Sequence, residues 1–139
     1  MRYMIALVIL ALTLTGTPAF AIDFTGTGIT GDLTYTEPST NSDGTPLTDL
    51  DRTEYRIDNG AGTVTPSVTV PASSPTGGQL VTVPNVTIPL PSSEVMTLAT
   101  IYVRACDNAL SRGANDTDNC SPEVTLTKPI DTLKPDMVQ

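Results

Sequence analysis

Proline is spread along almost the whole chain, and this feature limits the possible fold more than any other. The 139 residues include 12 prolines and 10 glycines, and a proline inside a helix removes a hydrogen bond and clashes with the preceding turn. No segment of ten or more residues places apolar side chains at the i, i+3, i+4 and i+7 spacing of an amphipathic helix. Short runs of alternating apolar and polar residues recur instead between turn-forming clusters, as in β-strands. The sequence therefore predicts an all-β fold, a sandwich of short strands.

The first 21 residues have the three parts of a secretory signal peptide. Arg2 gives a short positive start, residues 4–14 are apolar, and Ala19-Phe20-Ala21 matches the A-x-A cleavage pattern. The apolar run is about a dozen residues long, whereas a membrane span needs roughly 20. We therefore expect cleavage after Ala21, no membrane span in the product, and a secreted, periplasmic or extracellular location.

The remaining residues, 22–139, have the length of a single domain with one core. We expect the sandwich to cover residues 22–127. The tail, 128–139, carries two prolines and mixed charges without alternation, so we expect it to be extended or disordered, with a contact arm of a larger assembly as the alternative. The predicted strands are residues 22–25, 29–36, 52–58, 63–70, 80–90, 99–107 and 123–127.

The alternation within these strands indicates which side chains form the core. We expect Leu33 and Tyr35 to point inward, and we expect a β-bulge near Pro84, where the alternation of the valines changes register. The clearest pattern belongs to the sixth strand, which places four side chains on its inner face: Ala99, Ile101, Val103 and Ala105.

The chain has two cysteines, Cys106 and Cys120. An even count in a protein sent to an oxidising compartment predicts a disulfide, whereas a zinc site needs more ligands than two cysteines and no histidine can supply. The bond would close the base of the polar loop 108–119 and stabilise the fold by about 3 kcal/mol on chain-entropy grounds.

The charge of the chain excludes some functions. Without Arg2, six basic residues face fifteen acidic ones, and there is no histidine. Nucleic-acid binding is disfavoured because it depends on clustered cations that neutralise phosphates. A serine or cysteine nucleophile would lack its usual histidine base. A pair of carboxylates can act as acid and base, but a solvated acidic loop is far more common, so we expect no catalytic residues and no enzyme activity.

Three series of residues carry a family resemblance: Leu33-Thr34-Tyr35-Thr36-Glu37-Pro38, then Asp43-Gly44-Thr45-Pro46-Leu47-Thr48-Asp49-Leu50, then Tyr55-Arg56-Ile57. They resemble a fibronectin type III domain, which places L-x-W-x-x-P on its second strand and whose bacterial members often continue with N-x-D-G-x-P-L-x-D-L and Y-x-I. Two later series resemble its sixth strand and the start of its seventh: Val103-Arg104-Ala105-Cys106-Asp107-Asn108 and Ser121-Pro122-Glu123-Val124.

The chain departs from the family in three respects. Tyr35 stands where the family usually has a tryptophan, Ala99 stands where it usually has the corner tyrosine, and the first strand is short or missing. The resemblance implies an immunoglobulin-like β-sandwich of about seven strands that binds, adheres or spaces rather than catalyses.

In such a sandwich the loops at one end carry recognition while the sheets hold them. We therefore expect a module that binds a protein or carbohydrate partner through loops 38–50 and 108–119. The candidate contact residues are Asp43, Thr45, Leu47, Asp49, Ser111, Arg112 and Asn115.

Two alternatives remain open. A structural subunit would use the edge left by the short first strand for strand addition and would form oligomers. A calcium-stabilised surface domain would bind the ion with loop carboxylates, since calcium takes six to eight oxygen ligands, although the EF-hand spacing is missing. No other cofactor is indicated, and the candidate ligands form two groups: Asp43, Asp49 and Asp51, and Asp107, Asp116 and Asp118.

Overall fold

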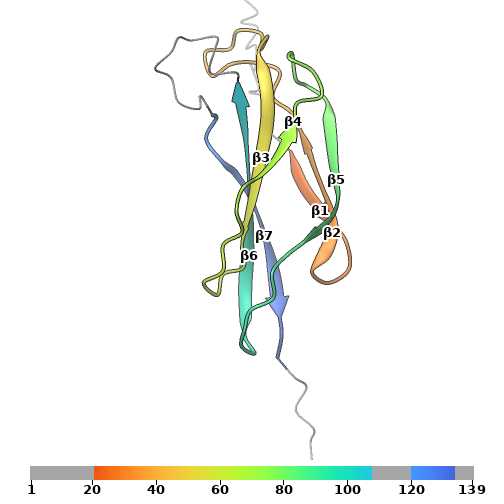
Figure 1. Cartoon of the computed structure of the whole chain (residues 1–139), viewed down its shortest axis with the longest axis vertical. Helices are drawn as coiled ribbons and strands as arrows, with labels where there is room; N and C mark the ends of the chain where they lie inside the picture. The colour runs from red at the N-terminus through yellow and green to blue at the C-terminus, as the bar shows by residue number, and fades with distance from the viewer. Residues whose placement is uncertain (1–20, 108–119, 134–139) are drawn as a thin grey trace, which may run out of the picture.

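Seven strands in two antiparallel sheets make up the protein in a computed structural model that describes residues 21–107 and 120–133 (Figure 1). One sheet has the strand order β1-β2-β5 and the other has the order β4-β3-β6-β7. These described residues form no helix, and so none that could cross a membrane. The prediction of an all-β sandwich is confirmed. The strands are β1 (Ile22–Thr25), β2 (Thr30–Thr36), β3 (Leu50–Asp58), β4 (Val68–Pro71), β5 (Leu80–Thr87), β6 (Met96–Asp107) and β7 (Val124–Asp131).

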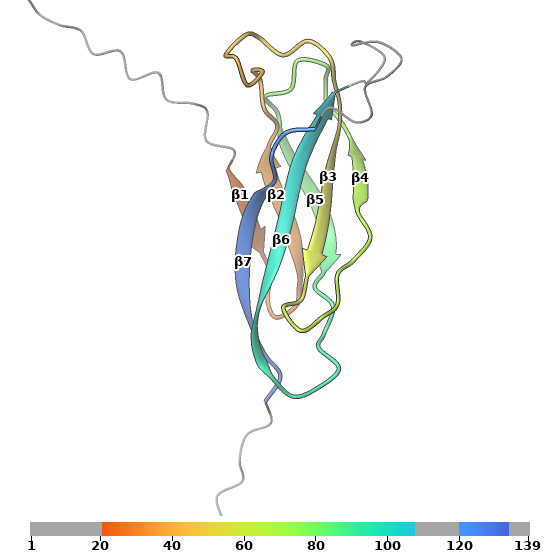
Figure 2. The same cartoon turned by 90° about the vertical axis from the view of Figure 1, so that its left-hand side faces the viewer.

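The core lies between the two sheets, which face each other in Figure 2. Leu33 and Tyr35 of β2 are fully buried, as predicted. Burial of a side chain as large as leucine contributes about 1.5–3 kcal/mol, so these inward-facing stripes hold the sheets together. The four inner residues predicted for β6 are also buried: Ala99, Ile101, Val103 and Ala105.

The predicted bulge near Pro84 is confirmed. The register between β2 and β5 shifts between Gly31 and Leu33. Asp32 therefore lies opposite two residues of β5, Pro84 and Asn85. The second of these, Asn85, has a φ of 57°, in the left-handed region that asparagine tolerates better than most residues. Its N–H donates to the Asp32 carboxylate at 3.2 Å, which satisfies a backbone donor that the bulge removes from the ladder.

The fourth strand is shorter than predicted, because Val68–Pro71 replaces the expected strand over residues 63–70. The side-chain carbonyl of Asn59 accepts hydrogen bonds from the N–H groups of Ala61 and Thr63, both at 2.9 Å, and so forms a wide turn after β3. Pro66 then has no N–H to donate to a ladder. Continuous pairing with β3 therefore starts only at Val68.

The last strand is longer than predicted. It continues to Asp131, whereas the sequence indicated a strand end at Thr127 and an extended or disordered tail from Lys128. Ile130 is buried in the core, and the ammonium group of Lys128 lies 4.5 Å from the centre of the Phe24 ring. A lysine at an inward-facing position concealed the alternation, because its apolar stem packs while its charge reaches the sheet edge.

The predicted signal peptide, apart from Ala21, and residues 134–139 of the predicted tail lie outside the described residues.

Candidate interaction site

The two loops predicted to bind a partner start side by side at one end of the sandwich. The β2–β3 loop leads into Leu50, the first residue of β3. In the ladder Leu50 lies opposite Asp107, the last residue of β6. After that residue the described chain resumes at Cys120, which forms a bridge with Cys106. The two loops thus share one base, at the end drawn uppermost in Figure 1, which we call the upper end.

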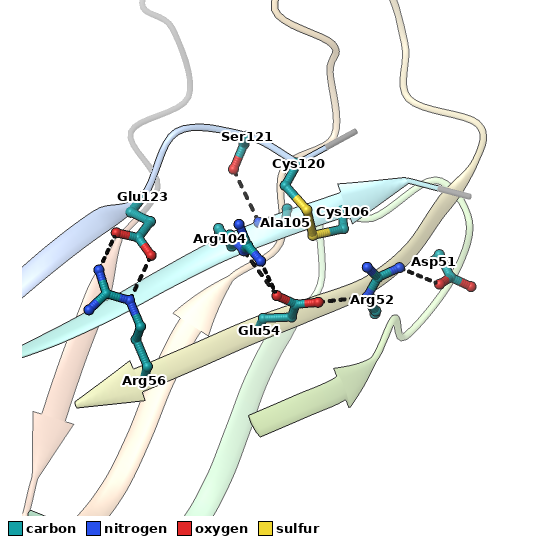
Figure 3. Close-up of polar contacts among 10 residues, drawn as sticks. All are labelled: Asp51, Arg52, Glu54, Arg56, Arg104, Ala105, Cys106, Cys120, Ser121 and Glu123. Carbon is teal, nitrogen blue, oxygen red and sulfur yellow. Dashed lines mark hydrogen bonds and ion pairs between the residues drawn. A yellow bond between two sulfur atoms is a disulfide. The ribbon is translucent and has the colours of Figure 1, made fainter. Parts of the chain in front are cut away.

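A disulfide closes this base (Figure 3). Cys106 and Cys120 are bonded, as predicted, with their Cα atoms 4.0 Å apart. Beside the bond, the N–H of Ser121 donates to the carbonyl of Ala105 at 2.7 Å, and the N–H of Ala105 donates to the Ser121 hydroxyl at 3.1 Å. The points where this loop leaves and re-enters the sheet are therefore fixed. Five predicted site residues lie outside the described residues: Ser111, Arg112, Asn115, Asp116 and Asp118.

An apolar anchor holds the β2–β3 loop against the sheet. Leu47 and Leu50 are buried together with Ala105, and Ala72 packs against them. The prediction that Leu47 contacts a ligand is corrected, because its side chain is only 7% exposed and belongs to this small core. The apolar residue of the loop therefore serves as its anchor and leaves the polar residues at the surface.

The exposed tip of the loop is a hydrogen-bonded turn. The Asp43 carboxylate accepts from the Thr45 N–H at 3.0 Å and from its hydroxyl at 2.6 Å. The Asn41 side-chain amide donates to the Thr45 hydroxyl oxygen at 2.9 Å. Asp43 and Thr45, two of the predicted ligand contacts, are thus exposed in a fixed arrangement.

The connection between β4 and β5 supports this loop from the side. Glu37, which is 2% exposed, accepts a hydrogen bond at 2.8 Å from the N–H of Ser73 in that connection. Gly77 has a φ of 58°, and a Cβ atom there would lie 1.9 Å from the carbonyl oxygen of Pro38. At Gly77, the β4–β5 connection is therefore packed too closely against the β2–β3 loop for any residue other than glycine.

The first group of predicted calcium ligands is not brought together. Asp43 holds the turn at the tip, Asp51 pairs with Arg52 at 3.1 Å, and Asp49 is half-buried at the base of the loop. In residues 21–107 and 120–133, these three carboxylates do not form a group with oxygens within 4.8 Å of one another. Asp107 of the second group is buried, and its two predicted partners lie outside the described residues.

One other group of possible metal ligands occurs in the described part of the chain. The Glu54 carboxylate lies within 4.8 Å of the sulfur atoms of Cys106 and Cys120. The sulfurs are bonded to each other and the carboxylate is bonded to two arginines. A cation would have no ligand available there, so this group is structural.

Glu54 is the centre of a charged cluster on the outer face of the four-stranded sheet (Figure 3). Its carboxylate accepts from Arg52 on the same strand at 2.8 Å and from Arg104 on β6 at 2.7 and 2.9 Å. Glu54 is 11% exposed, yet the hydrogen bond from Arg52, together with that from Arg104, lowers its pKa below the ordinary glutamate value against the opposing effect of burial. The cluster ties β3 to β6 directly beneath the disulfide.

A second pair extends this cluster along the sheet. Arg56 donates two hydrogen bonds to Glu123, at 3.0 and 2.8 Å, and its guanidinium lies 3.8 Å from the centre of the Tyr102 ring. The hydrogen bonds from Arg56 lower the pKa of Glu123. The sequence pattern did not single out these residues. The alternating Arg52, Glu54 and Arg56 on one strand indicate a shared face, but their partners depend on the strand register.

No protein-family model, curated protein or solved structure matches this chain.

Proposed function

We propose that this chain is an exported, non-catalytic binding module of the fibronectin type III class, and that it holds a protein or carbohydrate partner with the loops of its upper end. The single observation that carries the proposal is the shared base of the two loops. Leu50 lies opposite Asp107, and the Cys106–Cys120 disulfide closes the second loop beside them.

The positions of the family-like residues support the class. Leu33 and Tyr35 lie buried on the second strand, where the family has its leucine and tryptophan. Tyr55 and Ile57 follow on the third strand, and the series from Val103 lies on the sixth. The tyrosine hydroxyl at the tryptophan position bonds to the Thr53 hydroxyl at 2.5 Å, so the smaller ring fills the site with its polar group satisfied.

The disulfide supports export. A bonded cysteine pair persists in oxidising compartments and is rare in the cytosol. Together with the signal-peptide pattern of residues 1–21, the Cys106–Cys120 bond indicates a location beyond the cytoplasm.

The kind of partner follows from the chemistry of the tip. Residues 42–46 are exposed and include no aromatic and no basic side chain, while Asp43, Thr45 and Asn41 are already held in one geometry. A fixed polar surface loses little conformational entropy on binding. It suits a partner that offers hydroxyl or amide groups, such as a glycan or a polar protein loop.

The test compares two variants on an array of glycans and extracellular proteins. The double substitution Asp43→Ala and Thr45→Ala removes the hydrogen-bonding groups of the tip. Thr63→Ala is the control, because Thr63 is exposed in the β3–β4 loop at the opposite end of the sandwich. We expect the tip variant to lose binding to array members that the wild-type protein and the control retain. Equal binding by all three proteins, or no binding by the wild type, contradicts the proposal.

Strand addition at β1 is less favoured by this geometry. β1 has four residues, and β7 of the facing sheet lies beside it. Lys128 of β7 contacts the Phe24 ring and donates to the carbonyl of Gly26 at 3.5 Å. An incoming strand at this edge would have to displace that side chain.

A further inference from the structure

The outer face of the four-stranded sheet becomes apolar at the end opposite the binding loops. Met96 and Leu98, at the start of β6, are 71% and 59% exposed. In the ladder Leu98 lies opposite Pro129 and Met96 lies opposite Asp131. Figures 1 and 2 show that β6 and β7 extend here beyond the strands of the facing sheet.

A groove of about 360 Å³ lies on this end of β6 and β7. It is lined by Met96, Thr97, Leu98, Pro129, Ile130 and Asp131. Leu133, just past the end of β7, is half exposed, and its N–H donates to the Asp131 carboxylate at 2.9 Å. Among the residues that line the groove, Met96, Leu98 and Pro129 expose neighbouring apolar side chains to solvent.

Two carboxylates lie at or near the groove. Asp131 flanks Met96, and Asp58 lies opposite Thr100, the next outward-facing residue of β6 after Leu98. Residues 21–107 and 120–133 contain four basic side chains. Arg52 and Arg104 pair with Glu54 toward the upper end, and Lys128 reaches across to β1. Arg56 lies two residues before Asp58 on the same face of β3 and pairs with Glu123. Beyond Leu133 the sequence has one lysine and one aspartate, which balance each other.

The charge and size of the groove indicate its occupant. A second copy of this acidic chain, with a net charge of −8, would be repelled by these carboxylates. A stable protein dimer buries roughly 800 Å² on each partner, from about 20–30 residues, whereas this groove is lined by six. Strand addition along β7 is hindered as well, because Pro129 has no N–H to donate.

We infer that this groove binds a short cationic segment of another protein, one that carries apolar side chains on one face and lysine or arginine beside them. The apolar side chains cover Met96 and Leu98, and the cations lie against Asp58 and Asp131. The groove and the binding loops are at opposite ends of the sandwich, so the two sites do not overlap. This inference does not depend on the proposed function of the upper end.

The experiment uses three synthetic peptides of equal length and pattern, built from Leu and Lys, from Ser and Lys, and from Leu and Glu. Fluorescence anisotropy measures their binding to the purified protein at about 0.15 M salt, where long-range attraction to a net acidic protein is largely screened. We expect the Leu/Lys peptide to bind at least tenfold more tightly than the other two. Equal binding of the Ser/Lys peptide would reduce the interaction to charge alone and overturn the inference.

Matched variants locate the site. The double substitution Met96→Thr and Leu98→Thr removes the apolar surface with a residue that favours strands, and we expect it to weaken Leu/Lys binding at least tenfold. Leu80→Thr is the control, since Leu80 is 72% exposed on β5 of the other sheet, and we expect a change of less than twofold. Equal loss in both variants, or no loss in the double variant, overturns the inference.

A second double variant tests how much the two carboxylates contribute to peptide binding. Asp58→Asn with Asp131→Asn keeps the side-chain oxygens that accept from Gly60 and Leu133 and removes both charges. We expect several-fold weaker binding of the Leu/Lys peptide. Should the wild-type protein self-associate and the Met96→Thr, Leu98→Thr variant not, the occupant is a second copy and the inference is wrong.

Discussion

The upper and lower halves of one face of the four-stranded sheet differ in the kind of side chain that they expose. On the outer face of the four-stranded sheet, the upper half carries arginines and glutamates that are paired with one another beside a disulfide. The lower half carries Met96 and Leu98, which are mostly exposed and have no covering element among the described residues.

The comparison separates the half whose side chains serve the fold from the half for which we propose a partner. Charge-assisted hydrogen bonds across strands satisfy their own groups and fix the strand ends from which the loops start. An exposed apolar groove contributes little to the stability of the isolated domain, because its side chains remain in water. Substitutions in the upper half should therefore change stability, whereas substitutions in the lower half should change binding.

The largest expected effect comes from the disulfide. The double substitution Cys106→Ala and Cys120→Ala removes a bond between residues 14 apart in sequence. We expect a loss of about 3 kcal/mol and a fall in Tm of roughly 10 °C or more in thermal unfolding. An unchanged Tm would show that the sheet holds the upper end without the bond.

A smaller effect is expected from Glu54, which lies between two arginines and is 11% exposed. Glu54→Gln removes the charge-assisted hydrogen bonds and should cost about 1–2 kcal/mol in chemical denaturation. Glu123→Gln is the control, because the Glu123 side chain is 32% exposed, and the loss should stay below about 1 kcal/mol. Equal losses in the two variants would contradict the structural role of the charged cluster around Glu54.

The upper half should also make stability sensitive to acid. The pKa values of Glu54 and Glu123 are lowered in the folded protein by hydrogen bonds from Arg52 and Arg56. Their contribution is therefore complete above the ordinary glutamate pKa of 4.5 and is lost as the pH falls through the lower folded values. Denaturation curves between pH 6 and about pH 3 should show a shallower acid dependence in Glu54→Gln than in the wild type. Identical slopes would contradict this cause.

The smallest effect on stability should come from the lower half. Met96→Thr and Leu98→Thr replace exposed side chains, and we expect the free energy of unfolding to change by no more than about 0.5 kcal/mol for each. The same denaturation assay checks this. A loss of more than about 1 kcal/mol would place these side chains in the core and remove the contrast between the two halves.

Much of the fold could be predicted because the buried stripes obey the period of two. Leu33, Tyr35 and the inner residues of β6 alternate cleanly, and the valines around Pro84 revealed the bulge by a break in that alternation. The end of β7 was missed because Lys128 occupies an inward-facing position, where the pattern requires an apolar residue. The start of β4 was missed because the Asn59 side chain competes for backbone donors.

The candidate site was harder to predict, since it depends on contacts between distant parts of the chain. Composition identified a polar loop at residues 38–50, but it could not separate Leu47, which anchors the loop on Ala105, from the exposed Asp43 and Thr45. The pairing of Glu54 with Arg104 requires the register of β3 against β6. Acidic residues close in sequence can have different roles: Asp43 lies at the tip of the loop and bonds Thr45, whereas Asp51 lies on β3 and pairs with Arg52.

The most direct test of the central claim, that this chain binds other molecules rather than copies of itself, is the mass of the purified protein by light scattering over a wide concentration range. We predict the mass of a monomer throughout, because Lys128 of β7 lies against Phe24 at the β1 edge and the carboxylates of Asp58 and Asp131 lie at or near the groove at the lower end. A reversible increase in mass with concentration would contradict that claim and would favour a self-assembling subunit.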